Sequence, residues 1–142
     1  MDRSAEARWT GDLKTGKGRV TLGSGAYEGP YSFASRFENA PETNPEELLG
    51  AAHAGCFSMA LNAALGRAGH QPTSITTTST VHLTKGEGGF GISGITLKTR
   101  GVVPGLMEAE FQKFAEETKA GCIVSRALSA VPMTLDAQLV SR

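Results

Sequence analysis

Residues 44–61 read NPEELLGAAHAGCFSMAL, and this stretch decides the fold of the chain. It predicts a long helix, because Asn44 can cap its N-terminus and Pro45 suits the first helical position. Glu47 stands three residues after Asn44, the spacing of a capping box. Gly69 is a plausible C-terminal stop. We therefore expect a helix from Asn44 to about Gly69.

Apolar or small residues fall on every face of this predicted helix, which indicates a helix enclosed on most sides. Alanine and glycine dominate it, so other backbones can approach closely. We place the helix at the centre of the fold and against a second subunit. The apolar stretch Leu48–Leu65 is interrupted by His53, Ser58 and Asn62 and contains glycine, which makes it a poor candidate for a bilayer span. We expect no membrane association.

The rest of the chain predicts an α+β fold in one domain, residues 1–142. β-Branched, aromatic and alternating patterns predict strands, with a turn at Gly23–Gly25 and a hairpin loop at Lys85–Gly89. The strands are Ala5–Leu13, Gly18–Leu22, Tyr31–Phe37, Ser74–Thr84, Gly91–Val102 and Met133–Val140. An amphipathic helix is expected over Pro104–Ala120, ended by Gly121, with a short helical turn over Cys122–Ala130.

Composition narrows the function. The 142 residues carry 14 basic and 14 acidic side chains, so no net field favours nucleic acid or an anionic membrane. Met1–Glu6 lacks the basic and apolar segments of a secretory signal, so we expect a cytoplasmic protein. Thiols are kept reduced there, and a cysteine pair is then more often catalytic or redox-active than structural.

Cys56 and Cys122 are the two cysteines of the chain. They lie 66 residues apart (122 minus 56), which excludes a CxxC site and requires the fold to bring the sulfurs together. A thiolate that attacks the O–O bond of a peroxide becomes a sulfenic acid, and a second thiol condenses with it to a disulfide that an external dithiol reopens. Two cysteines suffice for this cycle.

Three motifs carry a family resemblance: Thr43–Leu48, Ala51–Leu61 and Gly121–Ser125 with its Cys122-Ile123-Val124-Ser125 order. Together they resemble the OsmC branch of the OsmC/Ohr family of peroxide-reducing proteins. The resemblance implies an OsmC-like fold, with antiparallel sheets around a long central buried helix. It also implies an intertwined homodimer with sites at the subunit interface. The activity implied is a two-cysteine peroxidase that reduces organic hydroperoxides and needs no cofactor, neither metal nor flavin.

By this resemblance Cys56 attacks the peroxide and Cys122 resolves the sulfenic acid. Burial alone would raise the pKa of Cys56, so the site needs a fixed positive charge. Arg36 is the candidate, preferred to Arg19. It would hydrogen-bond the peroxide oxygens, while Glu46 would hold its guanidinium in a bidentate pair.

Glu46 lies ten residues before Cys56, so in one straight helix their backbones are roughly 15 Å apart. Either a partner subunit delivers Arg36 and Glu46 to Cys56, or a break near Gly50 folds the first turn back. We favour the partner subunit.

Two other function classes stay open. The protein could be a redox-sensing or ligand-binding dimer whose cysteines oxidise without turnover. It could also be an acyl hydrolase in which His53 acts as base for a cysteine. For the peroxidase, the resemblance suggests a lipoyl dithiol carried on a protein as reductant, and an apolar pocket near Phe57 and Met59 would favour alkyl hydroperoxides. Many family members carry proline after the second cysteine, where this chain has Ile123.

Overall fold

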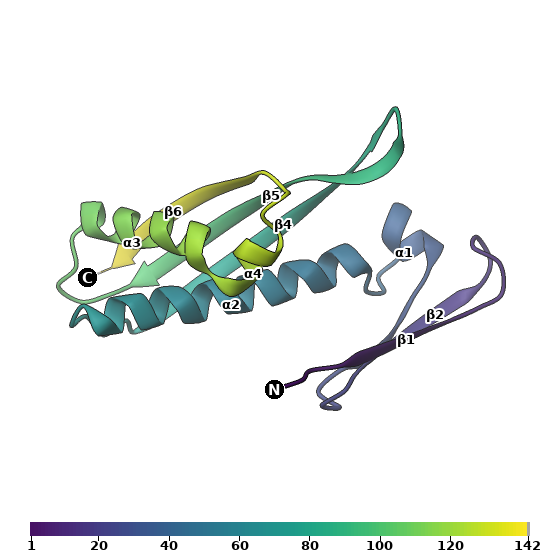
Figure 1. Cartoon of the computed structure of the whole chain (residues 1–142), viewed down its shortest axis with the longest axis horizontal. Coiled ribbons are helices and arrows are strands. Elements are labelled where there is room, and N and C mark those ends of the chain that lie inside the picture. Colours follow the sequence, from purple (N-terminus) through teal and green to yellow (C-terminus); the bar gives the residue numbers. More distant parts are fainter. Residues whose placement is uncertain (142) are drawn as a thin grey trace. The chain divides into compact units, whose positions relative to one another are not determined.

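The chain forms two compact units, Met1–Leu48 and Leu49–Arg142. The structure is a computed structural model that describes residues 1–141. Each unit is built around its own three-stranded sheet (Figure 1). The expected α+β class is confirmed, with two small sheets and a central helix. The expectation that residues 1–142 make one domain stays a prediction.

The first unit is an antiparallel meander followed by one short helix. Its strands pair in the order β1-β2-β3. They are β1 (Ala5–Thr10), β2 (Lys17–Leu22) and β3 (Glu28–Tyr31), and helix α1 covers Phe33–Phe37. The rings of Trp9 and Tyr31 pack across the sheet with centroids 5.5 Å apart. The first strand ends earlier than predicted, because Gly11 adopts a φ of 92° and begins a turn.

The strand predicted over Tyr31–Phe37 is wrong. Tyr31 ends β3, and a helix begins at Phe33. Ser32 has an extended backbone and accepts a hydrogen bond from the Ser35 amide, while the Ser35 hydroxyl accepts one from the Ser32 amide. This reciprocal capping box outweighs the β-propensity of the aromatic residues.

Helix α2 (Pro45–Arg67) runs without interruption for 23 residues, so the alternative of a break near Gly50 is not observed. The predicted cap is present, because Asn44 Oδ1 accepts the Glu47 amide at 2.8 Å. The Glu47 carboxylate departs from the predicted capping box and accepts the hydroxyl of Thr43 at 3.0 Å. Gly69, with φ of 89°, ends the segment as expected.

The second unit places helices against a mixed sheet of order β4-β5-β6 (Figure 1). Its elements are β4 (Ser74–Gly86), β5 (Gly89–Val102), α3 (Glu108–Gly121), α4 (Ile123–Ala127) and β6 (Met133–Ser141). The antiparallel expectation holds for β4 with β5, but β6 runs parallel to β5. The hairpin turn is shorter than predicted, and α3 begins later than predicted, at Glu108.

The core of this unit lies between one face of the sheet and the helices. Buried members come from α2, β5, α3 and β6: Phe57, Leu61, Leu65, Ile95, Leu97, Phe111, Ala115 and Ala137. Helix α2 approaches β4 closely at Gly50, where an added Cβ would lie 3.1 Å from the Ser79 carbonyl oxygen. The opposite face of β4 exposes Thr76, Thr78 and Thr80. This alternation of inward-facing and outward-facing side chains along β4 fixes the register of the sheet.

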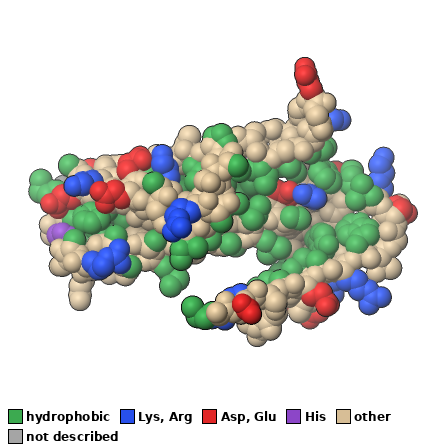
Figure 2. All heavy atoms as spheres, viewed as in Figure 1, with side chains coloured by type: hydrophobic (Ala, Val, Ile, Leu, Met, Phe, Trp, Pro, Cys, Tyr) green, Lys and Arg blue, Asp and Glu red, His purple; other side chains and the backbone are tan. Residues whose placement is uncertain are grey.

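The outward face of α2 is exposed within one chain, and the expected contact of this helix with a second subunit stays a prediction. Apart from Glu47, Asn62 and Arg67, its exposed residues are small or apolar, and Met59 is 76% exposed. In Figure 2 hydrophobic side chains reach the surface along the course of α2, whereas acidic and basic side chains alternate over α3. Among residues 1–141, α2 is long and apolar enough to cross a membrane, which is weak evidence because core helices of soluble proteins are similar.

Candidate active site

The structure brings the two cysteine sulfurs together. Cys56 Sγ on α2 lies 3.2 Å from Cys122 Sγ, and both thiols are free. A disulfide bond is about 2.05 Å long, so only a small movement separates this arrangement from the bonded one. The requirement that the fold unite residues 66 apart is therefore met within the second unit.

The two cysteines differ in exposure and surroundings. Cys122 is 3% exposed and precedes α4, where its sulfur accepts the Ser125 backbone amide at 3.4 Å. Cys56 is only partly buried. A dissolved molecule that enters the site can therefore reach Cys56 more readily than Cys122.

The surroundings also shift the pKa values of the two cysteines in opposite directions. Burial raises the pKa of Cys56, and contact with Cys122 raises it further. Burial also opposes ionisation of Cys122, but hydrogen bonds from the Ser125 hydroxyl, the Ser125 amide and Cys56 bring its pKa below the ordinary value. Within the second unit, negative charge is thus better stabilised on Cys122 than on Cys56.

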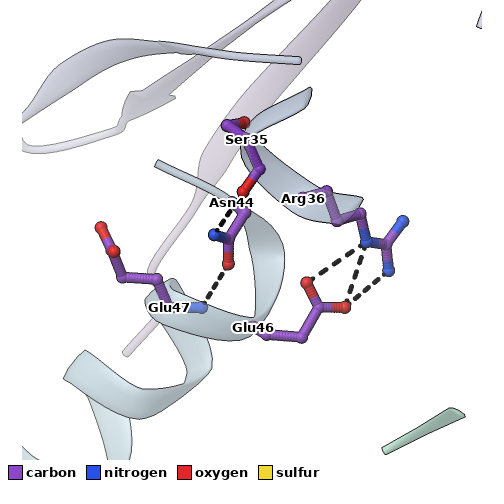
Figure 3. A network of polar contacts seen from close by, with 5 residues as sticks. All are labelled: Ser35, Arg36, Asn44, Glu46 and Glu47. Carbon is purple, nitrogen blue, oxygen red and sulfur yellow. Dashed lines mark hydrogen bonds and ion pairs between the residues drawn. The ribbon is translucent and has the colours of Figure 1, made fainter. Parts of the chain in front are cut away.

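Arg36 and Glu46 form the predicted pair in the first unit. Arg36 Nε lies 3.1 and 3.2 Å from the two Glu46 carboxylate oxygens, and Nη2 lies 2.8 Å from Oε1. The Glu46 side chain is 9% exposed and that of Arg36 is 41% exposed. The buried carboxylate holds one edge of the guanidinium, while Nη1 makes no hydrogen bond with residues 1–141 and can donate to a ligand (Figure 3).

A polar junction between α1 and α2 fixes this pair. Asn44 Nδ2 donates to the Ser35 carbonyl at 2.9 Å, and its Oδ1 caps α2 (Figure 3). The Ser35 hydroxyl lies within hydrogen-bond distance, 2.7 Å, of the Thr43 carbonyl. The motif around residues 43–47 therefore orients Arg36 relative to Glu46 through the backbone as well as through the ion pair.

Arg19, the less favoured arginine, lies on β2 and pairs with Glu28 at 2.9 Å in an exposed position. Phe57, which we expected near an apolar pocket, is fully buried in the core and cannot line one. Ile123, in place of proline, is 75% exposed as the first residue of α4, so its side chain does not hold the helix by packing.

His53 does not pair with a cysteine. Its Nε2 lies 2.8 Å from the Ser125 hydroxyl, and its Nδ1 is buried without a partner among residues 1–141. Burial lowers the pKa of His53 and so favours the neutral ring. A direct cysteine–histidine nucleophile, required by the acyl hydrolase hypothesis, is not formed. The sequence placed Ser125 in the Gly121–Ser125 motif but gave no sign that it would contact His53.

Comparisons with known proteins identify the family of the chain. The family model described as OsmC-like protein matches residues 38–136. The chain belongs to this family. The OsmC-like chain is also 51% identical to a curated protein of Escherichia coli (strain K12) named Peroxiredoxin OsmC, over 99% of both chains. A Shigella flexneri protein of the same name matches equally.

Solved structures place the OsmC-like chain in the same fold. An organic hydroperoxide resistance protein from Elizabethkingia anophelis aligns with a TM-score of 0.77 and 26% identity, over 96% of both chains. The organic hydroperoxide resistance protein OhrB of Bacillus subtilis aligns with a TM-score of 0.75 and 25% identity, over 95% of this chain and 98% of that one. The resemblance inferred from the motifs is confirmed.

Proposed function

We propose that this protein is a thiol-dependent peroxidase that reduces organic hydroperoxides to alcohols through Cys56 and Cys122. The prediction of a cysteine-based peroxidase is confirmed by the full-length identity to Peroxiredoxin OsmC, and its organic substrates by the hydroperoxide resistance proteins of the same fold. The 3.2 Å contact between the two sulfurs carries the assignment of the residues.

The reaction follows from the pair. The Cys56 thiolate attacks one oxygen of ROOH, the O–O bond breaks, and the alkoxide takes a proton to leave as ROH. Cys56 is then a sulfenic acid. Cys122 attacks that sulfur, a disulfide forms, and the hydroxyl leaves with one proton as water. An external dithiol reduces the disulfide and is itself oxidised. Cys56 is the attacking sulfur because it is the more exposed of the two.

Arg36 supplies the cation that Cys56 lacks. Burial works against the Cys56 thiolate, and a guanidinium offsets that cost while its N–H groups bind the peroxide and the departing alkoxide. Glu46 holds the guanidinium in the required orientation. Since α2 is unbroken between Glu46 and Cys56, we assign Arg36 and Glu46 of one subunit to Cys56 of the other.

A homodimer is therefore part of the proposed site, and α2 provides its contact surface. Met59 is 76% exposed on a face of small residues, the kind of surface that closely packed helices bury. Met59→Glu should shift the protein to monomers in sedimentation, because an interface would bury an unpaired charge. Met107→Glu, at a methionine that is 62% exposed before α3, is the matched control. A dimeric Met59→Glu protein would contradict this interface.

The proposed cycle uses a dithiol as reductant, such as a lipoyl group carried on a protein, and it needs no metal or flavin. The proposed location is the cytoplasm, where thiols are kept reduced. Alkyl hydroperoxides should be preferred to hydrogen peroxide, since each buried methylene contributes about 0.8 kcal/mol. Equal kcat/KM for hydrogen peroxide and a bulky alkyl hydroperoxide would contradict this preference.

Intact-mass measurement after one equivalent of alkyl hydroperoxide tests the residue assignment. The wild type should lose two hydrogens, Cys122→Ser should gain one oxygen at Cys56, and Cys56→Ser should show neither change. Oxygen gained at Cys122 in the Cys56→Ser protein would reverse the two roles. Steady-state consumption of peroxide with a dithiol separates an enzyme from a redox sensor, which reacts once and stops.

A further inference from the structure

A buried hydrogen-bond chain connects α2 to the second cysteine. His53 is fully buried, and its Nε2 lies 2.8 Å from the hydroxyl of Ser125, which is 3% exposed. The same serine approaches Cys122 Sγ with its backbone amide, and Cys122 in turn contacts Cys56. The peroxidase cycle described above does not use His53.

The unpartnered nitrogen decides which tautomer His53 adopts. A neutral imidazole carries one N–H, on Nδ1 or on Nε2. A proton on Nδ1 would be a buried donor without an acceptor, because Nδ1 has no partner among residues 1–141. Such a donor costs about 1–3 kcal/mol, whereas the Nε2–H tautomer leaves Nδ1 as a bare acceptor, and buried N–H groups without an acceptor are rarer in folded proteins than under-satisfied acceptors. The proton therefore belongs on Nε2, where it is donated to the Ser125 oxygen.

This tautomer fixes the direction of the hydrogen bonds that run from His53 through Ser125 to Cys122. When Ser125 Oγ accepts a hydrogen bond from His53 Nε2–H, the serine hydroxyl proton can be donated to a different acceptor. The Cys122 sulfur is available as that acceptor, because it already accepts the backbone amide of the same serine at 3.4 Å, and the Ser125 side chain lowers the pKa of Cys122. Cys122 then receives both the hydroxyl and the backbone amide of Ser125. Hydrogen bonds to a charged acceptor are stronger than those to a neutral one, so this arrangement favours the thiolate.

We propose that His53 is a positioning residue for the resolving step: by donating to Ser125 it directs the serine hydroxyl at Cys122 and stabilises the thiolate that attacks oxidised Cys56. The catalytic use of the chain rests on the function proposed above. In that step the Cys122–Cys56 S–S bond forms, the Cys56 S–OH bond breaks, and the hydroxide takes a proton from solvent to leave as water. No proton is transferred to His53, whose burial disfavours its charged form.

The other ionisable groups at this end of the unit are Cys56, which contacts the sulfur, and two cations. Lys119 on α3 and Arg126 on α4 line the same hollow as Ser125. These three groups can also influence the ionisation of Cys122. A test of the hydrogen bonds from His53 through Ser125 must therefore leave Lys119 and Arg126 unchanged.

Titration of Cys122 in a Cys56→Ser background isolates its ionisation from the coupled pair. Relative to this background, His53→Leu should raise the Cys122 pKa by about one unit, because the hydroxyl loses its direction. Ser125→Ala should raise it at least as much. His53→Gln should restore most of the shift, since its side-chain amide offers an N–H near the position of Nε2. Thiolate absorbance in the ultraviolet provides the readout.

With both cysteines present, stopped-flow oxidation separates the two chemical steps. His53→Leu should slow disulfide formation about tenfold, the fold-change that corresponds to one pKa unit of thiolate at constant pH. The effect should fall on this second phase and be rescued by His53→Gln. Nitrogen NMR of the full chain should show the Nε2–H tautomer.

Several outcomes would overturn the proposal. They are an Nδ1–H tautomer, an unaltered Cys122 pKa in Ser125→Ala, or a His53→Gln protein as impaired as His53→Leu. If His53→Leu does not fold, Ser125→Ala and His53→Gln still decide the result. Because the titration needs no peroxide, it tests the hydrogen-bond chain even if the proposed peroxidase cycle fails.

Discussion

The sulfur pair and the arginine pair show two different ways to control charge. In the second unit, Cys122 lies in the apolar core and accepts neutral hydrogen bonds, and the partly buried Cys56 packs against it. In the first unit, Arg36 presents a partly exposed guanidinium on a buried carboxylate. The first arrangement stabilises charge on Cys122 and disfavours it on Cys56, and the second offers a cation. The site proposed above combines the two, so that the guanidinium offsets the cost of charge on Cys56.

Removal of the cation should have the largest effect. Arg36→Ala should lower kcat/KM for an alkyl hydroperoxide by about 10²–10³-fold, the loss typical of a missing donor to developing negative charge. Arg36→Lys should recover part of it, because a lysine keeps the charge but not the two-edged geometry. Arg19→Ala is the control, since Arg19 pairs with Glu28 on an exposed strand. Equal losses in Arg36→Ala and Arg19→Ala would remove the distinction between the two arginines.

Mixed dimers test whether the cation comes from the other subunit. A chain with Arg36→Ala keeps Cys56, and a chain with Cys56→Ser keeps Arg36. If each site combines groups from both subunits, the purified mixed dimer contains one complete site and recovers about half of the wild-type activity. If Arg36 serves Cys56 of its own chain, the mixed dimer has no complete site. Activity no higher than that of the two parent dimers would exclude the shared site.

Loss of the supporting carboxylate should have a smaller effect. Glu46→Gln keeps the size of the side chain but weakens the pair with Arg36, so the guanidinium becomes less ordered. We expect kcat/KM to fall about tenfold, less than in Arg36→Ala. Glu47→Gln is the matched control, because Glu47 accepts a hydrogen bond from Thr43 and does not contact Arg36. A Glu46→Gln enzyme with wild-type kinetics would show that Arg36 needs no such support.

The sequence allowed the central helix to be predicted because its signals are local. Asn44, Pro45 and Gly69 define its ends, and each acts within a few residues. The same kind of signal was present at Ser32 and Ser35, but the aromatic residues around it suggested a strand. Arg36 was identified correctly as the partner of Glu46 while being assigned to the wrong type of element.

Contacts between distant residues could not be obtained in this way. His53 and Ser125 are 72 positions apart, and no periodicity relates them. The parallel pairing of β5 with β6 likewise depends on how α3 and α4 return the chain to the sheet edge. Small and apolar residues occur on every face of α2, so the sequence could not show which face is buried within the chain and which was expected to meet a second subunit.

The smallest expected effect is a change in how stability depends on pH. It should be altered by a substitution in the neutral His53–Ser125 pair and not by one in the charged Arg36–Glu46 pair. Burial lowers the pKa of His53 in the folded protein, whereas in the unfolded chain it is about 6.5. Below that value the unfolded state binds more protons, so the free energy of unfolding should decrease as pH falls from about 6.5 toward the lowered pKa. His53→Gln removes this contribution, and its urea midpoint should change less between about pH 7 and pH 5.5 than that of the wild type. Arg36→Ala keeps His53 and should retain the wild-type slope. If His53→Gln and the wild type lose stability equally over this range, His53 is not held neutral by burial, and the tautomer argument for Ser125 loses its basis.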